Sequence, residues 1–271
     1  MVRSLWTAAT GMIAQQNNVD TIANNIANVN TVGYKTETNE FKSLLYQTLQ
    51  TRTTTANGAQ KPISAQVGLG TRNASITSQF TQGALLESES NTAFAIQGEG
   101  FFAVRGEDGT NYYTRNGDFN WSLTANGIAL TNSDGQAVLN TQGQPITLGN
   151  QYIASKLTVT ADGQIMYPDA QNNPQPLNIS IGLFQFMNPK GLNKEGDSLY
   201  TVSAASGAAM NEATNNNLNK SVVRQGYLEG SNVQVADEMV NLIVAQRAYE
   251  LNSKAITTTD DMMSTAVQVK R

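Results

Sequence analysis

Two segments at opposite ends of the chain repeat apolar residues at intervals of seven, and this spacing constrains the fold more than any other feature. Near the N-terminus the repeating residues are Leu5, Met12, Val19 and Ile26, with Ile22 and Val29 each three positions after one of them. Near the C-terminus they are Val235, Leu242, Tyr249, Ile256 and Met263. Such spacing is typical of helices that pack along a shared seam, as in a coiled coil. We therefore predict that residues 1–34 and 226–271 form one coiled-coil-like helical domain, and that these seam residues pack subunits together.

Both predicted helices are poor in charge. Charged residues make up 14% of the chain, whereas an average soluble domain has about 25%. From Met1 to Tyr34 the charged side chains are those of Arg3 and Asp20 alone, where an exposed helix usually carries Glu–Lys pairs. The C-terminal helix, which we expect Ser231 or Asn232 to cap, has further apolar residues off its seam: Ile243, Val244, Ala248 and Met262. This surface favours a chain that buries much of its outside against other chains; a neutral extracellular monomer is the alternative.

The stretch ANNIANVNTVGYK, residues 23–35, contains four asparagines within an apolar spacing. Asparagine is a poor helix former because its side chain competes for backbone hydrogen bonds, and Gly11 costs the helix interior a further ~1 kcal/mol. Isolated helices are marginal in water even with favourable residues. We therefore predict that the first helix orders during assembly, that its amides and hydroxyls find partners on neighbouring chains, and that it stops at Gly33.

Between the ends, the pattern changes to short apolar and aromatic runs separated by Asp-Gly, Asn-Gly and Gly-Gln turns. These runs predict antiparallel hairpins in a β domain that spans residues 76–225. Residues 35–75 are predicted to be a connector made of a short helix, indicated by Phe41, Leu44, Leu45, Thr48 and Leu49, and a polar extended ribbon over 51–66. Residues 203–220 are predicted to be a second, flexible connector. The predicted fold class is thus α+β, with an antiparallel β domain inserted between two terminal helices.

The residue inventory argues against catalysis. The chain has no histidine and no cysteine, which excludes Ser–His and Cys–His nucleophiles and thiolate metal sites. Its acidic residues fall singly in turns, so an enzyme that cleaves cell-wall glycan with two carboxylates ranks last among the alternatives. The net charge of −4 argues against nucleic-acid binding, and no apolar run approaches the roughly 20 residues of a membrane span. We predict no catalytic residue, no cofactor, no metal, no nucleic-acid partner, no direct membrane insertion and no secretory signal peptide.

Three stretches resemble motifs of one family, the bacterial flagellar rod and hook proteins. They are NNIANVNTVGYK, GYLEGSNVQVADEMVNLIVAQRAYELNSKAITTTDDMM, and IQGEGFFAV followed by YTRNGDFNWSLTANG. The matching residues at the two ends include Asn25, Ala27, Asn28, Thr31, Gly33, Tyr34, Gln246, Arg247, Ala248, Glu250 and Asn252. Within the family the chain most resembles distal rod members, through RSLWTAATGMIAQQ and a polar insertion between FKSLLYQTL and VGLGTR. A proximal rod or hook paralogue is the alternative.

The resemblance implies an axial structural subunit of the flagellar basal body, not an enzyme. Many copies would stack helically into a hollow homopolymeric shaft that carries torque from motor to hook, with the terminal helices inside and the β domain outside. The implied partners are copies of itself, neighbouring rod and hook proteins, and the flagellar type III export apparatus. The implied location is outside the cytoplasmic membrane, and periplasmic in a cell with an outer membrane. A secreted, non-flagellar adhesin that binds through its β domain is the competing function.

Overall fold

The computed structural model describes residues 2–50, 65–124, 127–169, 171, 173–215 and 217–269. The chain forms two compact units. The first, the helical unit, comprises Met1–Ala27, Glu37–Ser78 and Gln234–Arg271, and the second, the β unit, comprises Asn28–Thr36 and Gln79–Val233. Terminal helices with antiparallel sheets between them confirm the α+β fold class. Among the described residues, no helix combines the length and the apolar character that crossing a membrane requires.

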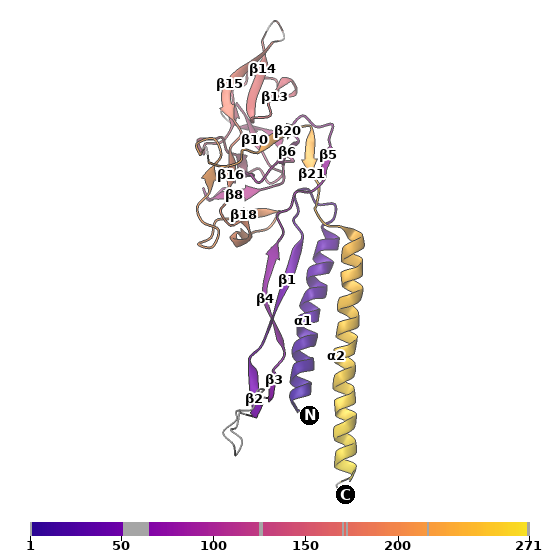
Figure 1. The fold of residues 1–271 in the computed structure, drawn as a ribbon. Helices are drawn as coiled ribbons and strands as arrows, with labels where there is room; N and C mark the ends of the chain where they lie inside the picture. Colours follow the sequence, from indigo (N-terminus) through magenta and orange to yellow (C-terminus); the bar gives the residue numbers. More distant parts are fainter. Residues whose placement is uncertain are drawn as a thin grey trace, which may run out of the picture. The chain divides into compact units, whose positions relative to one another are not determined.

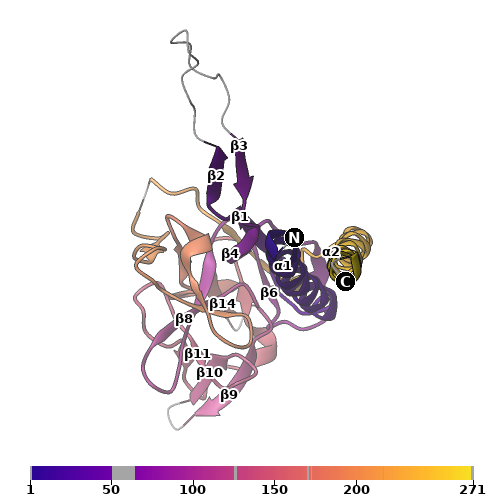
Figure 2. The same cartoon turned by 90° about the horizontal axis from the view of Figure 1, so that it is seen from below.

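The helical unit is built from two long helices and a two-stranded ribbon. Helix α1, Val2–Ala27, lies between the ribbon and helix α2, Val235–Val269 (Figures 1 and 2). The ribbon consists of β1 (Glu37–Ser43) paired with β4 (Thr71–Ser78), and β2 (Tyr46–Gln50) paired with β3 (Ala65–Gly68). The two pairs are joined by hydrogen bonds from Leu44 N to Gly70 O, 2.9 Å, and from Leu69 N to Leu45 O, 3.3 Å. The hydrogen-bonded ladder is therefore continuous from the β1–β4 pair into the β2–β3 pair.

The ribbon corrects the prediction of a short helix at Phe41–Leu49. Those residues lie in β1, β2 and the two positions between them. Their apolar side chains recur at helical intervals, but Leu45 and Leu49 are exposed and pack against no core, so this spacing carried no helical signal. Strands β3 and β4 supply the ladder hydrogen bonds instead, which a local pattern cannot show. Of the predicted polar ribbon over 51–66, residues 51–64 lie outside the described residues and 65–66 begin β3.

Helix α1 ends earlier than predicted, at Ala27 instead of Gly33. The Thr31 amide donates to the Asn28 carbonyl at 3.2 Å, and the Thr31 hydroxyl donates to the Asn28 side-chain oxygen at 3.1 Å. The backbone bond closes a tight turn, and the side-chain bond favours this turn over a further helical turn. Val29, the last predicted seam residue of this segment, therefore lies outside the helix.

The β unit is made of short strands whose described pairings are all antiparallel. Its largest sheet runs in the order β12–β10–β11–β7–β8–β18–β17, with β9 on β10 and with β16 joining β7 to β19. These strands are β7 (Phe101–Arg105), β8 (Asn111–Thr114), β9 (Asn120–Thr124), β10 (Gly127–Thr131), β11 (Ala137–Val138), β12 (Thr147–Leu148), β16 (Leu183–Gln185), β17 (Asn193–Lys194), β18 (Leu199–Thr201) and β19 (Met210–Asn211).

Three smaller sheets complete the unit. One has the order β13–β14–β15, and the other two pair β20 with β6 and β21 with β5. Their strands are β5 (Leu85–Glu87), β6 (Phe94–Gln97), β13 (Thr158–Val159), β14 (Gln164–Pro168), β15 (Pro174–Ser180), β20 (Val222–Gln225) and β21 (Tyr227–Glu229). Short 3₁₀ turns lie at Ala154–Lys156 and Pro189–Gly191.

The core of the β unit is apolar and aromatic. Its larger cluster gathers residues such as Phe94, Phe102 and Leu130 from β6, β7 and β10. A second cluster is centred on Phe101, whose ring makes an edge contact with Phe186 at 5.5 Å between centroids. Alternate residues of β7 thus enter two different clusters, as the period of two in a strand requires.

Residues 203–220, predicted to be a flexible connector, belong to this unit and carry buried groups. Strand β19 pairs with β16, and the Glu212 carboxylate is 4% exposed. It accepts hydrogen bonds from Ser221 N at 2.7 Å, Ser221 Oγ at 2.8 Å and Gln185 Nε2 at 2.8 Å. The prediction was wrong because a segment rich in polar residues can be ordered by hydrogen bonds to distant residues.

Candidate assembly interface

Helix α2 presents two interleaved rows of residues at intervals of seven. One row is the predicted one, in which Leu242, Ile256 and Met263 are half-buried while Val235 and Tyr249 are exposed. The other row was not predicted and is small or polar: Glu238, Ala245, Asn252 and Thr259. Of these, Glu238, Ala245 and Thr259 are buried and Asn252 is half-buried. A search of the sequence for apolar repeats alone could not find this row, although its interval of seven was available as a signal.

Asn252 shows how closely the two helices approach. A β-carbon placed on Gly11 of α1 would lie 2.9 Å from the Asn252 side-chain nitrogen, nearer than such contacts ordinarily allow. Glycine in this helix interior is therefore explained by contact with α2, which offsets its poor helix propensity.

Helix α1 buries small and polar residues as well as apolar ones. Of its predicted seam residues, Ile22 is buried, whereas Leu5, Met12, Val19 and Ile26 are half-buried, as is Val29 beyond the helix end. The remaining buried residues of α1 are Ala8, Ala14, Thr21 and Asn25. The ribbon touches α1 through Thr10, whose hydroxyl oxygen accepts a hydrogen bond from Thr71 N at 3.4 Å. Small side chains let α1 pack on both sides, against the ribbon and against α2.

Asn25, one of the motif residues, joins all three parts of the helical unit. Its side-chain nitrogen donates to the Glu37 carbonyl at 2.8 Å, and its oxygen accepts from the Glu37 amide at 2.9 Å. The nitrogen also lies 3.4 Å from a carboxylate oxygen of Glu238 in α2. Asn25 is 1% exposed. Its partners are thus on its own chain, where we had expected partners on neighbouring chains.

The rest of the N-terminal motif forms the turn after α1. Ala27 is the last helical residue, Asn28 and Thr31 make the turn described above, and the Tyr34 carbonyl accepts from Asn232 N at 3.4 Å. Gly33 has φ = +70°, and a β-carbon there would lie 2.6 Å from the Asn116 amide nitrogen. Both the backbone angle and the lack of space require glycine.

The C-terminal motif residues lie on α2, and two of them, Gln246 and Glu250, line one side of a groove in the helical unit. The groove has a volume of about 600 Å³ and is lined by Gln16 and Val19 of α1 and by Gln246, Tyr249 and Glu250 of α2. Glu250 pairs with Arg247 at 2.7 Å, but both side chains are largely exposed, so this pair contributes little to stability. Ala248 is half-buried.

The outward face of α2 carries an apolar stripe, which we call the outer stripe. Each of its side chains is more than half exposed: Val240, Val244, Leu251, Met262 and Val269. Trp6 and Ile13 form a similar exposed pair on α1. Among the described residues, the β unit has fewer exposed large hydrophobics than the helical unit, and they come from separate segments: Leu86, Leu123, Ile153, Met187, Val202 and Val222. Exposed apolar side chains aligned along one side of a helix on a soluble surface mark a binding surface.

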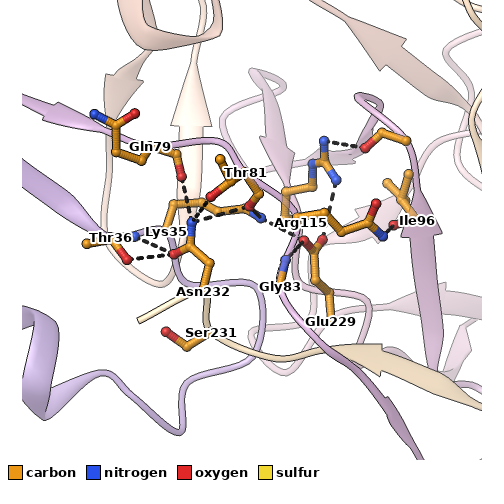
Figure 3. A network of polar contacts seen from close by, with 12 residues as sticks. Lys35, Thr36, Gln79, Thr81, Gly83, Ile96, Arg115, Glu229, Ser231 and Asn232 are labelled. Atoms are coloured by element: carbon orange, nitrogen blue, oxygen red, sulfur yellow. Dashed lines mark hydrogen bonds and ion pairs between the residues drawn. The ribbon is translucent and has the colours of Figure 1, made fainter. Parts of the chain in front are cut away.

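A buried ionic cluster in the β unit joins three sequence motifs, and we call it the junction cluster (Figure 3). The Lys35 ammonium lies 2.6 Å from one oxygen of Glu229, and the Arg115 guanidinium lies 3.3 Å from the other. The side chains of Lys35 and Glu229 are fully buried and that of Arg115 is 2% exposed. The sequence analysis missed the cluster, although all three residues stand in quoted motifs of a chain with few charges.

The remaining hydrogen bonds of the junction cluster come from the backbone. Lys35 donates to the Thr81 carbonyl at 2.7 Å, the Gly83 amide donates to Glu229 at 3.0 Å, and Arg115 donates to the Gly98 carbonyl at 2.9 Å. Two cations share the Glu229 carboxylate, and the carboxylates of Glu212 and Glu99 also raise the pKa of Arg115 against the lowering by burial. Burial lowers the pKa of Lys35 from its ordinary value, although Glu229 opposes the shift.

Asn232 holds the same region together with an uncharged side chain (Figure 3). Its oxygen accepts from the Thr36 amide at 2.7 Å and from the Thr36 hydroxyl at 2.8 Å. Its nitrogen donates to the Gln79 carbonyl at 2.8 Å and to the Thr81 hydroxyl at 2.8 Å. The prediction that Ser231 or Asn232 caps α2 is wrong, because α2 begins at Val235 and the Asn232 side chain binds two other segments instead, at Thr36 and at Gln79–Thr81.

Comparison with known proteins finds the same family at both ends and in the middle. The family model of the flagella basal body rod protein matches residues 5–35. The flagellar hook protein FlgE/F/G D1 domain matches 95–167, and the flagellar basal body rod FlgEFG protein C-terminal model matches 224–269.

Relatives match along the whole chain. The flagellar basal-body rod protein FlgG of Borreliella burgdorferi is 42% identical over 273 residues, which cover 100% of both chains. FlgG of Bacillus subtilis is 35% identical, again over 100% of both chains. The flagellar hook-basal body complex protein FlhP of the same species is 29% identical over 97% of both.

Proposed function

The chain belongs to the family of flagellar basal-body rod proteins, and we propose that it is a structural subunit of the distal rod. In this proposal many copies polymerise helically into a hollow shaft that transmits torque from the motor to the hook. The role is mechanical, and no catalytic step is part of it.

The outer stripe of α2 is the observation that carries the proposal. An isolated chain leaves Val244, Leu251 and Met262 in water on a helix whose opposite rows already pack against α1. Because burying apolar area is the main driving force of association, we propose that the outer stripe packs against helices of neighbouring subunits. The predicted seam residues would then bring α1 and α2 together as a coiled-coil-like pair within this layer.

The ribbon supplies a second candidate contact between subunits. Leu45, Tyr46 and Leu49 project exposed apolar side chains beside the polar insertion that resembles distal rod members. We propose that ribbons of stacked subunits touch one another and stiffen the shaft.

The assignment to the distal rod is supported by the two Bacillus subtilis relatives. The chain is more similar to FlgG than to FlhP of that species, 35% against 29% identity. Relatives named as rod proteins also cover the full chain, which favours a rod subunit over the adhesin alternative. We propose neighbouring rod and hook proteins and the flagellar type III export apparatus as partners. The proposed location is the basal body outside the cytoplasmic membrane, periplasmic where an outer membrane exists.

Electron microscopy of basal bodies tests the proposal. A strain that lacks the gene for this chain should form basal bodies with a truncated shaft and no hook, and a plasmid copy should restore both. Full-length shafts in the deletion strain would show that the chain is not a rod subunit.

A further inference from the structure

Two segments that are far apart in the sequence meet inside the β unit. We call residues 28–36, which follow α1, the N-terminal strap, and residues 226–233, which precede α2, the C-terminal strap. Their backbones are joined by hydrogen bonds from Gly33 N to Glu229 O, 2.7 Å, and from Asn232 N to Tyr34 O, 3.4 Å. Both straps belong to the β unit, although the sequence analysis had placed residues 28–34 and 226–233 in the helical domain. The residues from which the two helices emerge are therefore held by one another.

The charges of the junction cluster make the two straps depend on each other. Lys35 is on the N-terminal strap, Glu229 is on the C-terminal strap, and Arg115 lies between β8 and β9. Without Glu229, both buried cations lose the carboxylate that they share, and among the described residues Lys35 has no other ion pair. An uncompensated buried charge is far more costly than a missing neutral contact. The N-terminal strap thus cannot bury Lys35 at low cost until the C-terminal strap has brought Glu229.

We propose that Glu229 is a coupling residue that makes the docking of the two straps mutually dependent. The C-terminal strap is the later of the two along the chain, so the N-terminal strap becomes fixed only when nearly the whole chain is present. The two straps, from which the chain enters and leaves the two helices, then become ordered together. This inference concerns the folding of one chain and stands whether or not the chain forms a rod.

The junction cluster predicts that replacing its carboxylate and replacing one of its cations have different effects on the two straps. Glu229→Gln takes from two buried cations, Lys35 and Arg115, the carboxylate that binds both of them. Lys35→Met removes one of the two cations, keeps most of the side-chain volume and leaves the Arg115–Glu229 pair in place. The carboxylate is therefore the critical member, and its loss should be tolerated better once Lys35 is also replaced.

Hydrogen exchange of the full chain tests the coupling, segment by segment. Glu229→Gln should raise the exchange rate at least about tenfold in both straps, since breaking a buried pair costs several times the thermal energy. Strands β7 and β10 should keep their protection. In the double variant Lys35→Met/Glu229→Gln, the rise in both straps should be clearly smaller. Glu250→Gln is the matched control, because Glu250 is also paired but exposed, and it should change neither strap.

Three results would overturn the proposal. In the first, Glu229→Gln opens the C-terminal strap while residues 28–36 keep their protection. In the second, Lys35→Met gives no relief in the double variant. If Glu229→Gln does not fold, Glu229→Asp serves instead, since it keeps the charge but draws it back by one methylene. It should raise exchange in both straps together, and a rise in one strap alone is the third contrary result.

Discussion

A single aspartate in the outer stripe should separate assembly from folding. Leu251 is the test residue because it is 68% exposed in the isolated chain. Complete burial of a leucine contributes about 1.5–3 kcal/mol, so covering its exposed part in a shaft contributes roughly 1–2 kcal/mol per subunit. In Leu251→Asp this gain is lost, and an unpaired carboxylate in the apolar contact costs several kcal/mol more. The total of about 4 kcal/mol or more corresponds to at least about a thousandfold rise in the concentration needed for assembly.

The assay compares polymer and monomer of the same variants. Pelleting and electron microscopy measure the concentration at which shafts form, and thermal unfolding measures the stability of the monomer. Leu251→Ala should raise the assembly concentration only about 5- to 30-fold, because it removes burial without adding charge. Thr257→Asp is the charge control, since Thr257 is also exposed on α2 but lies roughly 120° around the helix from Leu251.

The monomer should be almost unaffected by Leu251→Asp, because exposed substitutions usually change stability by less than about 0.5 kcal/mol and aspartate adds only its lower helix propensity. If the Leu251→Asp monomer unfolded well below the wild-type temperature while shafts still formed, the stripe would belong to the fold of one chain. The reasoning that leads from exposure to assembly would then be refuted.

Three further predictions concern the junctions between elements. Gly33→Ala should lower the free energy of unfolding in urea by at least about 2 kcal/mol, because φ is positive and the new β-carbon meets the backbone. The control Gly109→Ala is also at positive φ but has open space around it, so it should lower the free energy of unfolding by about half as much or less. Asn25→Ala should speed proteolytic loss of the terminal helices roughly tenfold while sparing the β unit, since the Glu37 amide loses its buried partner; equal cleavage rates would contradict this. Because burial lowers the pKa of Lys35, the unfolded chain binds more protons than the folded chain between that lowered pKa and the ordinary value of 10.5. The free energy of unfolding should therefore rise with pH in this window, relative to that of Lys35→Met. Parallel pH profiles of stability for the two proteins would count against this.

The sequence predicted what depends on local periodicity. Heptad spacing placed both terminal helices, and turn dipeptides placed the hairpins between them. Strands β1 and β2 were missed, and a short helix was predicted in their place, because they obtain their hydrogen bonds from strands β4 and β3, which follow only after an intervening stretch. The polar row of α2 was missed because its residues, such as Asn252 and Thr259, are explained by packing against a second helix, which the sequence of α2 alone does not show. The junction cluster was missed for the same reason, since Lys35 and Glu229 are 194 positions apart.

Asn25 shows why a poor helix former stands at the end of α1. Its amide donates to and accepts from the backbone of Glu37, as a neighbouring strand would, and so ties the helix to the first residue of β1. Aspartate cannot donate, leucine can do neither, and glutamine is longer by one methylene. The local cost of asparagine is thus offset by a contact that exists only when helix and ribbon are packed. The order of such a helix depends on the elements packed against it more than on its own sequence. Contacts with neighbouring subunits at the exposed Trp6 and Ile13 of α1 should therefore order it further.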